Sequence, residues 1–235
     1  MTDYAHETPR LWLQKMTVED HLQGFHQLWN KEEATQSVKE TVEDAKAWML
    51  TTLPTPEDPD IDKYAILLRP VEENPQPWVD ERGRPTMIGM TGTNRFSDEG
   101  METGYCMHVA YWGRGYAGEA FRGFLELFWG LEERRRFMQL VAKVDEGNVA
   151  SSRIIARAGG VKAGILKEWY SRPGSNGVKG DVAFWLIDRP GVSEDEMKEW
   201  KEEIKKQMVR KKELEKAKEE RKIVEKQPAE RLGKE

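Results

Sequence analysis

The stretch YWGRGYAGEA, residues 111–120, decides the fold of this 235-residue chain. It holds Gly113, Gly115 and Gly118 in the spacing G-x-G-x-x-G, which lets backbone N–H groups come close to an anion. An amphipathic helix follows at once, because apolar residues recur at helical spacing from Ala117 to Leu131. A glycine loop that leads into a helix N-terminus is typical of a pyrophosphate-binding site.

A dinucleotide-binding fold is one alternative for this loop, and its surroundings argue against it. That fold needs an acidic residue about 20 positions further on, at the end of the next strand. Glu132 and Glu133 lie at about that distance, but they end the helix and precede the strand. The carboxylate at the end of the strand itself, Asp145, comes much later. The glycine spacing alone is therefore weak support for NAD binding.

The rest of the chain has the pattern of an α+β protein. Strands are predicted over 10–16, 63–69, 86–96, 101–109, 137–144, 161–170 and 178–188. Helices are predicted over 17–30, 41–54, 116–136 and 148–160. The three strands between residues 63 and 109 have no helix between them, which predicts antiparallel pairing. We expect a mixed, mostly antiparallel seven-stranded sheet flanked by about four helices.

A change of composition separates a tail from the body. Residues 193–235 hold 14 Lys+Arg and 13 Asp+Glu, which predicts a highly charged helix. The body before them is acidic, which disfavours nucleic acid as a partner and suits a cationic substrate. We expect one domain over 1–192 and a charged helical tail over 193–235.

The location of the protein is suggested by what the sequence contains. Cys106 is the only cysteine, so no disulfide forms within the chain and a reducing compartment is favoured. The start, MTDYAHETPR, has no signal or transit pattern, and no apolar run is long enough to span a membrane. We expect a cytoplasmic protein, with the nucleus left open, and no membrane partner.

A second motif, NVASSRIIARAGG over 148–160, follows the strand at 137–144. It predicts a short helix with Asn148 as its N-cap and Gly159 or Gly160 at its end. Together with HVAYWGRGYAGEAF over 108–121, it resembles the GNAT superfamily of N-acetyltransferases. The resemblance covers roughly residues 10–190. It points to the branch that includes ribosomal-protein N-terminal acetyltransferases and spermidine acetyltransferases.

The match to the two family motifs is close but incomplete. The family loop [QR]-x-x-G-x-[GA] is met by Gly115 and Ala117, with Trp112 in place of Gln or Arg. The second signature, N-x-x-S-x-R followed by a glycine, is met from Asn148 onward, but Gly160 stands where a large aromatic is usual.

The resemblance implies a GNAT-like fold and acetyl-CoA as co-substrate. Backbone N–H groups of the loop would hold the pyrophosphate, and the last free N–H of the preceding strand would donate to the acetyl carbonyl. The residues expected to bind acetyl-CoA are Met107, His108, Val109, Gly113, Arg114, Gly115, Tyr116, Ala117, Gly118, Asn148 and Arg153.

The resemblance also suggests candidates for proton transfer. Glu102 lies where histone-acetyltransferase relatives place a base, and Glu168, on a later strand, is the second candidate. Ser151 lies where this branch places a proton donor for the leaving thiolate, and Tyr170 is the alternative acid. Structural alternatives are a strand residue without a catalytic role for Glu102, on a solvated face, and for Glu168, a first-turn helix residue for Ser151 and a strand aromatic for Tyr170. For Asn148 the alternative is a plain N-cap.

These features predict an acetyl-CoA-dependent N-acyltransferase. The acceptor would be a primary amine, either a protein N-terminus, a polyamine or another small amine, that attacks acetyl-CoA directly in a ternary complex. No metal is expected, because His108 and Cys106 have no further ligands near them in the sequence. The alternative is a non-catalytic module of the same fold that binds CoA or a protein partner. The sequence leaves a homodimer open.

Overall fold

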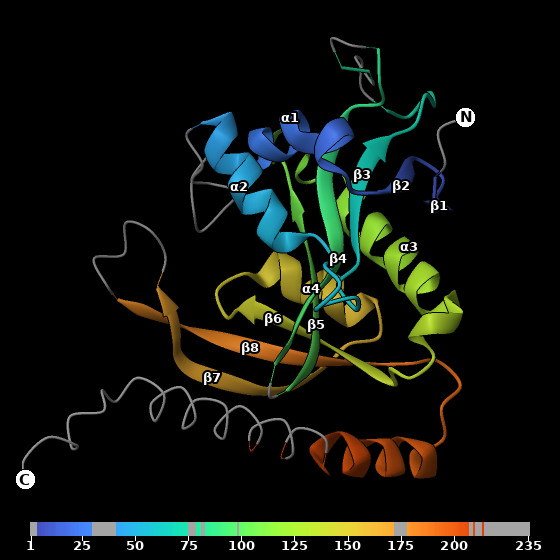
Figure 1. Ribbon diagram of the computed structural model, residues 1–235, viewed down its shortest axis with the longest axis vertical. Coiled ribbons are helices and arrows are strands. Elements are labelled where there is room, and N and C mark those ends of the chain that lie inside the picture. The colour runs from blue at the N-terminus through green and yellow to red at the C-terminus, as the bar shows by residue number, and fades with distance from the viewer. Residues whose placement is uncertain are drawn as a thin grey trace, which may run out of the picture. The chain divides into compact units, whose positions relative to one another are not determined.

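The computed structural model describes residues 4–29, 41–74, 79–80, 83–97, 99–171, 178–206, 209 and 213 of the chain. The chain divides into two compact units, Met1–Pro190 and Gly191–Glu235. Among the described residues, the first unit holds one sheet and four α-helices (Figure 1).

In the second unit, residues 194–206 form a helix. Its start is capped reciprocally, since Ser193 Oγ accepts from the Glu196 N–H (3.3 Å) and Glu196 Oε2 accepts from the Ser193 N–H (2.8 Å). A charged helix was expected here, and most of the predicted tail beyond it lies outside the described residues.

The sheet of the first unit has eight strands in the order β1-β2-β3-β4-β5-β6-β8-β7. The strands are β1 (His6–Glu7), β2 (Leu11–Lys15), β3 (Lys63–Leu68), β4 (Met87–Ser97), β5 (Gly100–Met107), β6 (Gln139–Asp145), β7 (Val161–Ser171) and β8 (Lys179–Asp188). All neighbours are antiparallel except β5 and β6, which are parallel. The mixed, mostly antiparallel sheet is therefore confirmed, but the predicted number of seven strands is wrong. The extra strand, β1, has only two residues and so shows no alternation in the sequence.

Three of the four α-helices described in the first unit begin after a residue whose side chain caps them, and the fourth begins after a glycine. They are α1 (Val18–Trp29), α2 (Val42–Thr52), α3 (Tyr116–Gly130) and α4 (Val149–Arg157), with short 3₁₀ helices η1 (Val109–Tyr111) and η2 (Glu132–Arg134). Thr17 Oγ1 accepts from the Asp20 N–H (3.2 Å), and Asn148 Oδ1 accepts from the Ser151 N–H (3.0 Å). The cap predicted at Asn148 is confirmed. Gly159, with a φ of 90°, follows the end of α4.

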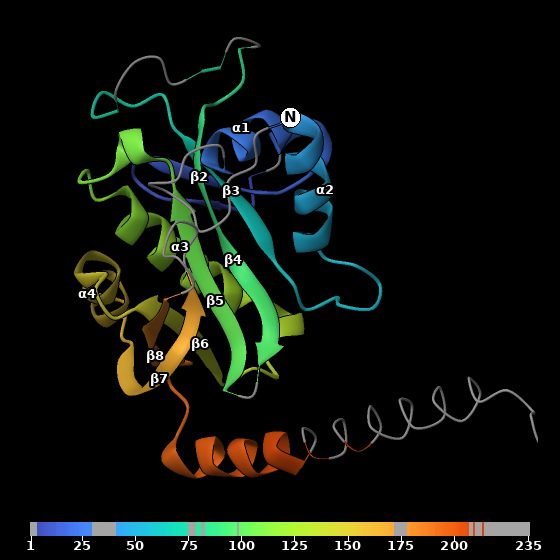
Figure 2. The same cartoon turned by 90° about the vertical axis from the view of Figure 1, so that its left-hand side faces the viewer.

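Two hydrophobic cores lie on opposite faces of the sheet. On one face, Phe121 and Phe124 of α3 pack in a cluster that includes Ile66 of β3. On the other face, Phe25 of α1 packs in a cluster that includes Ala65 of β3. Successive residues of β3 thus pack in different cores, which explains why residues 64–68 are all apolar. Figure 2 shows α1 and α2 on one side of β3–β5 and α4 on the other.

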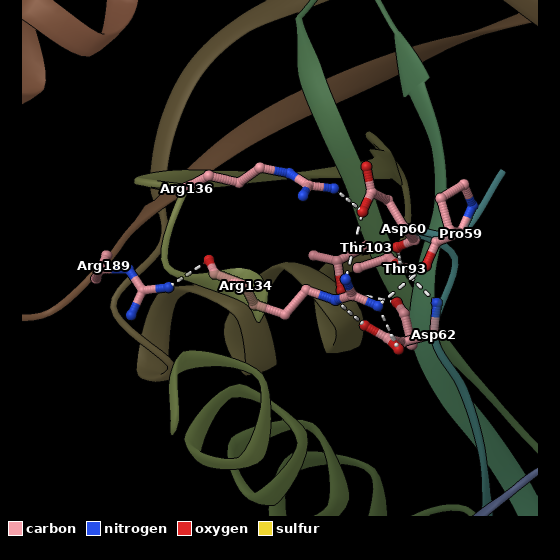
Figure 3. A network of polar contacts seen from close by, with 9 residues as sticks. Pro59, Asp60, Asp62, Thr93, Thr103, Arg134, Arg136 and Arg189 are labelled. Atoms are coloured by element: carbon pink, nitrogen blue, oxygen red, sulfur yellow. Dashed lines mark hydrogen bonds and ion pairs between the residues drawn. The ribbon is translucent and has the colours of Figure 1, made fainter. Parts of the chain in front are cut away.

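A buried arginine ties the start of β3 to the connection between α3 and β6. Arg134 donates from Nε to Asp62 Oδ2 (2.7 Å) and from Nη2 to Asp62 Oδ1 (3.0 Å), and it also reaches Asp60 (3.3 Å). Arg136 pairs with Asp60 as well, and Arg189 donates to the backbone carbonyl of Arg134 (2.6 Å), as Figure 3 shows. These contacts hold the connection that leads into β6 against the residues that precede β3.

Candidate active site

Strands β5 and β6 run side by side for only three residue pairs, residues 101–103 with residues 140–142. Beyond them, β5 continues along β4, where Met107 pairs with Gly89. Meanwhile β6 continues along β8 as far as Asp145. The two strands therefore part after Thr103, and the β6-facing edge of residues 104–107 lies outside the ladder.

The backbone N–H groups at the end of β5 point alternately to its two sides. The His108 N–H donates to the Ile88 carbonyl of β4 (2.8 Å), so it is already used. Alternation then directs the Met107 N–H toward the side from which β6 has parted. Val109 opens η1. Of Met107, His108 and Val109, Met107 is therefore the residue whose N–H faces the side that β6 has left.

Two glycines of the loop have a backbone conformation that favours glycine. Gly113 and Gly115 have φ values of 73° and 81°, a left-handed conformation that residues with a Cβ rarely adopt. Gly115 is the N-cap of α3 and makes no side-chain cap hydrogen bond. The first-turn N–H groups of α3, including those of Ala117 and Gly118, therefore keep their capacity to bind an anion.

Other loop residues differ in what they contribute. The Tyr116 side chain is buried and its hydroxyl donates to Asn74 Oδ1 (2.7 Å), so only its backbone remains for a ligand. A Cβ added at Gly118 would meet Ile154 Cγ1 at 3.8 Å, an ordinary contact, so packing does not require this glycine. Arg114 is exposed, as expected of a side chain that reaches a phosphate.

Arg10, which the sequence analysis missed, holds this loop from the side of β2. Its Nη1 donates to the Arg114 carbonyl (3.1 Å), and its guanidinium lies 4.5 Å from the centre of the Tyr116 ring. Its Nε donates to Glu119 Oε2 (2.7 Å) in the first turn of α3. Glu119 would place a negative charge beside an anion site, and Arg10 neutralises that charge.

The start of α4 brings a second set of predicted residues toward β5. Asn148 caps the helix, and Ser151 lies half-buried in its first turn. The Tyr105 hydroxyl of β5 donates to Ser151 Oγ (3.0 Å). Arg153, two positions after Ser151, is exposed. Tyr105 was not among the predicted residues, because its partner is 46 positions away and neither family motif includes it.

Glu102 lies on the opposite face of β5 from Tyr105, and it is buried. Its Oε1 is 2.8 Å from Lys143 Nζ of β6, and its Oε2 is 3.4 Å from Arg95 Nε. Lys143 Nζ also lies 2.8 Å from Glu99 Oε2. Burial acts to lower the pKa of Lys143, but hydrogen bonds to both carboxylates outweigh burial and raise it. Glu102 is thus part of an ion-pair cluster, and the structural alternative of a solvated strand residue does not apply.

The other two catalytic candidates lie on the edge strand. Glu168 is exposed and has a positive φ of 48°, within an irregularity between Leu166 and Tyr170 where β7 leaves its register with β8. The irregularity changes the direction in which the side chains of β7 point, and the centre of the Trp169 ring lies 4.5 Å from Lys143 Nζ. The Tyr170 hydroxyl donates to Asp145 at the end of β6.

Ser151 and Glu102 lie on opposite faces of the sheet. Ser151 contacts Tyr105 on one face of β5, and Glu102 lies on the other face, close to the point where β5 and β6 part.

Cys106 does not have the environment of a nucleophile. Burial raises the pKa of its thiol to about 12, so the thiolate does not form near neutral pH. Within the described part of the chain, no three His, Cys, Asp or Glu side chains are grouped so that they could hold a metal. Over the same residues, no helix is both long and apolar enough to cross a bilayer.

The comparisons with known proteins agree with this geometry. Residues 10–161 match the family model described as acetyltransferase (GNAT) domain. The protein of Bacillus subtilis named "Uncharacterized protein YkkB" is 38% identical over 69 residues, which are 29% of this chain and 38% of that protein. The chain thus spans about two fifths of the length of that relative.

Two solved structures resemble the fold at low identity. One is titled as the RimL ribosomal L7/L12 alpha-N-protein acetyltransferase in complex with coenzyme A; it is 17% identical, with a TM-score of 0.61, over 79% of this chain and 98% of that one. The other, a spermidine N-acetyltransferase SpeG chimera from Vibrio cholerae and hSSAT, is 15% identical, with a TM-score of 0.53, over 76% and 96%. With the family model matched over most of the folded body, and the sheet and glycine loop in agreement, this chain belongs to the GNAT acetyltransferase family.

Proposed function

We propose that this protein transfers the acetyl group of acetyl-CoA to the α-amine of a peptide or protein N-terminus, by direct attack in a ternary complex. One observation carries the proposal. The left-handed glycines at 113 and 115 open onto the N-terminus of α3, which follows β5 along the chain after the residues of β5 that have parted from β6. A pyrophosphate bound at the helix start would leave the thioester arm free to lie along the unpaired edge of β5.

The loop supplies the binding energy for the pyrophosphate. The N–H groups of the first turn of α3 donate to it, the helix dipole favours its negative charge, and Arg114 adds a cation. Each hydrogen bond to a charged group contributes about 1.5–3 kcal/mol. The family match and the coenzyme A in the RimL complex support acetyl-CoA as the co-substrate.

The chemistry takes place at the parting of β5 and β6. The Met107 N–H donates to the acetyl oxygen and stabilises the charge that develops there as the amine attacks. The bond from the acetyl carbon to sulfur then breaks, and its electron pair stays on sulfur. The Ser151 hydroxyl donates to this sulfur. A base takes the proton that the amine loses, the thiolate gains a proton, and exchange with solvent restores the base, so that one proton passes overall from the amine to the thiol. Because Cys106 stays a thiol, no acetyl-cysteine step is needed.

The charges on the Glu102 face favour an α-amine over a polyamine. The carboxylates of Glu99 and Glu102 are balanced by Lys143 and Arg95, so the cluster offers no net negative charge to a polycation. A Cβ added at Gly104, next to Glu102 on the same face, would meet no described heavy atom within 4 Å, so an acceptor has room there.

The pKa of the acceptor amine also favours an α-amine as the acceptor. An α-amine with a pKa of about 7.7–8.0 is roughly one third neutral near pH 7.4, whereas a lysine amine is neutral in about one molecule in a thousand. An α-amine thus needs little help from a base that is already held by a cation. Glu102 is the base of the proposal, and Lys143 keeps its contact with Glu99 when Glu102 takes the proton. Glu168 is the second candidate.

Calorimetric titration with acetyl-CoA tests the first half of the proposal. We expect micromolar binding that Gly115→Asp abolishes, because the substitution strains the backbone and puts a carboxylate in the anion site. Gly191→Asp is the matched control, since Gly191 has the same φ of 81° and open space around it, but lies in the other unit. Failure of the wild-type protein to bind would mean that the glycines only shape a turn.

Release of free thiol from acetyl-CoA tests the second half. The acceptors are a peptide with a free α-amine, an Nα-acetylated lysine peptide and spermidine. We expect the first to be preferred, and Glu102→Gln to lower kcat while the dissociation constant of acetyl-CoA stays unchanged. Preference for spermidine would refute the acceptor class. Binding without thiol release from any amine would support the non-catalytic module instead.

A further inference from the structure

We infer that Tyr105 is a positioning residue that orients the Ser151 hydroxyl toward the sulfur of the leaving coenzyme A. This inference rests on the proposed function, in which Ser151 donates to that sulfur. It adds a residue that lies outside both sequence motifs. The observation behind it is the hydrogen bond from the Tyr105 hydroxyl to Ser151 Oγ, at 3.0 Å.

The bond joins the two strands of the site at the place where they have parted. Tyr105 lies on β5 two positions after Thr103, the last residue that pairs with β6. Ser151 lies in the first turn of α4, which follows β6. The hydroxyl pair therefore bridges from the unpaired edge of β5 to the helix after β6, on the same face as α3. A thioester arm that follows the edge of β5 passes this pair.

Both partners are held in place by independent contacts. The Tyr105 ring packs against the Phe121 ring of α3, with the ring centres 5.7 Å apart. Ser151 is fixed by its backbone N–H, which donates to the Asn148 cap (3.0 Å). Both hydroxyls are already in position before the substrate binds, so the arrangement is preorganised.

The direction of the hydrogen bond decides what Ser151 can do. A serine hydroxyl has one donor hydrogen and two lone pairs. When Oγ accepts from Tyr105, the Ser151 hydrogen is left for another acceptor, and the bond it makes is strengthened because the two hydrogen bonds polarise each other. Burial raises the pKa of the Tyr105 phenol, so Tyr105 stays a donor across the working pH range and does not itself lose a proton.

The protonation of bound coenzyme A gives a readout that does not depend on turnover. A donor aimed at the sulfur stabilises the thiolate and lowers the pKa of the bound thiol below its free value, near 8.5 for a thiol. The pKa is measured by ultraviolet titration of the CoA complex, with the thiolate as the absorbing form. We expect Ser151→Ala to raise it by about 1, and Tyr105→Phe by about 0.5. The double variant should match Ser151→Ala alone, because Tyr105 acts through Ser151.

Turnover provides the second readout. With Tyr105→Phe we expect kcat to fall about fivefold and the KM for acetyl-CoA to stay within twofold. The deficit should shrink as pH rises past the thiol pKa, because a stable thiolate needs no donor. Tyr64→Phe is the matched control, since Tyr64 of β3 packs against Phe124 of α3 in the same core and lies away from Ser151. Both phenylalanine variants keep the ring, and thermal unfolding checks that they fold.

The outcomes separate this inference from the proposed function. If Ser151→Ala shifts the thiol pKa and Tyr105→Phe does not, the inference fails and the proposed function stands. Additive shifts in the double variant would also overturn it, because Tyr105 would then act without Ser151. If the wild-type protein binds no coenzyme A, the proposed function and the inference fail together.

Discussion

The Nζ atom of Lys143 lies 2.8 Å from Oε1 of Glu102, across the parallel pairing of β5 and β6. Both side chains are on the sheet face opposite α3, where the proposed acceptor approaches. The ammonium of Lys143 also contacts Glu99 and the face of the Trp169 ring. Two carboxylates and an aromatic ring are a favourable setting for a cation, and the protein fills it with its own side chain. Lys143 therefore decides how much negative charge an acceptor meets.

Replacing Lys143 by methionine should change the acceptor preference. Lys143→Met keeps most of the length of the side chain but removes the ammonium from Glu99 and Glu102, and Arg95 still pairs with Glu102 (3.4 Å). We expect kcat/KM for spermidine to rise about tenfold relative to that for an α-amine peptide, since one charge at 4 Å is worth about 4 kcal/mol near a protein surface before screening. Lys162→Met, which removes a surface pair with Glu146 (3.1 Å), is the control. An unchanged preference would show that the cluster is not part of the acceptor site.

Removing Arg134 should destabilise the fold more than removing a surface arginine. Arg134→Ala leaves the buried Asp62 carboxylate without its two hydrogen bonds from Arg134. Breaking a buried pair in this way costs about 3–5 kcal/mol of unfolding free energy. Arg135→Ala removes only an exposed contact with Glu132 (2.9 Å), for which at most about 1 kcal/mol is expected. Urea unfolding of both variants measures the difference, and equal losses would mean that Asp62 is compensated by other groups.

Local features of the sequence predicted most of the elements but not the contacts between them. Apolar patterns located β2 to β8, each of which has at least five residues, and for β3 the pattern is a continuous apolar run. The strand β1 is too short to show a pattern. Gly113 and Gly115 were recognisable because a left-handed backbone restricts the residue type. The polar contacts of the site join distant positions: Arg10 and Glu119 are 109 residues apart. The hydrophobic periodicity of the sequence cannot predict a contact between residues so far apart. A lysine within the apolar strand 139–145 was the one local sign of the Lys143 cluster.

The buried Lys63 should make stability depend on pH. Burial lowers the pKa of Lys63 from 10.5 to about 8, although Asp62 partly opposes this shift. Between pH 8 and pH 10.5 the unfolded chain keeps a proton on Lys63 that the folded protein has released, so this group makes the protein more stable as pH rises. At pH 7 the cost of burying the charge is about 3 kcal/mol.

Two lysine variants isolate this effect. Lys63→Met should be more stable than the wild type at pH 7, and its advantage should narrow between pH 8 and pH 10.5. Lys15→Met, at an exposed position of β2, should differ from the wild type by a constant amount over this range. Urea unfolding at a series of pH values gives both curves. An advantage that did not change with pH would show that Lys63 is charged or neutral in both states alike.

Arg10 should control the affinity for acetyl-CoA without itself meeting the acetyl group. Arg10→Gln removes the contact with the Arg114 carbonyl and leaves the Glu119 charge unbalanced in the first turn of α3. We expect the dissociation constant of acetyl-CoA to rise about tenfold, because a carboxylate at a helix N-terminus repels the pyrophosphate that the proposal places there. Added salt should reduce this loss, since the repulsion is screened.

The double variant Arg10→Gln/Glu119→Gln distinguishes charge from loop geometry. If charge dominates, removing Glu119 as well should restore most of the affinity, even though the contact with the Arg114 carbonyl is still missing. Arg84→Gln is the control, because Arg84 makes a half-buried pair with Asp80 (3.1 Å) in a different loop. Calorimetry of the four proteins gives the comparison. Equal weakening in the single and double variants would mean that Arg10 acts by holding the loop, and that the charge of Glu119 is not felt at the pyrophosphate.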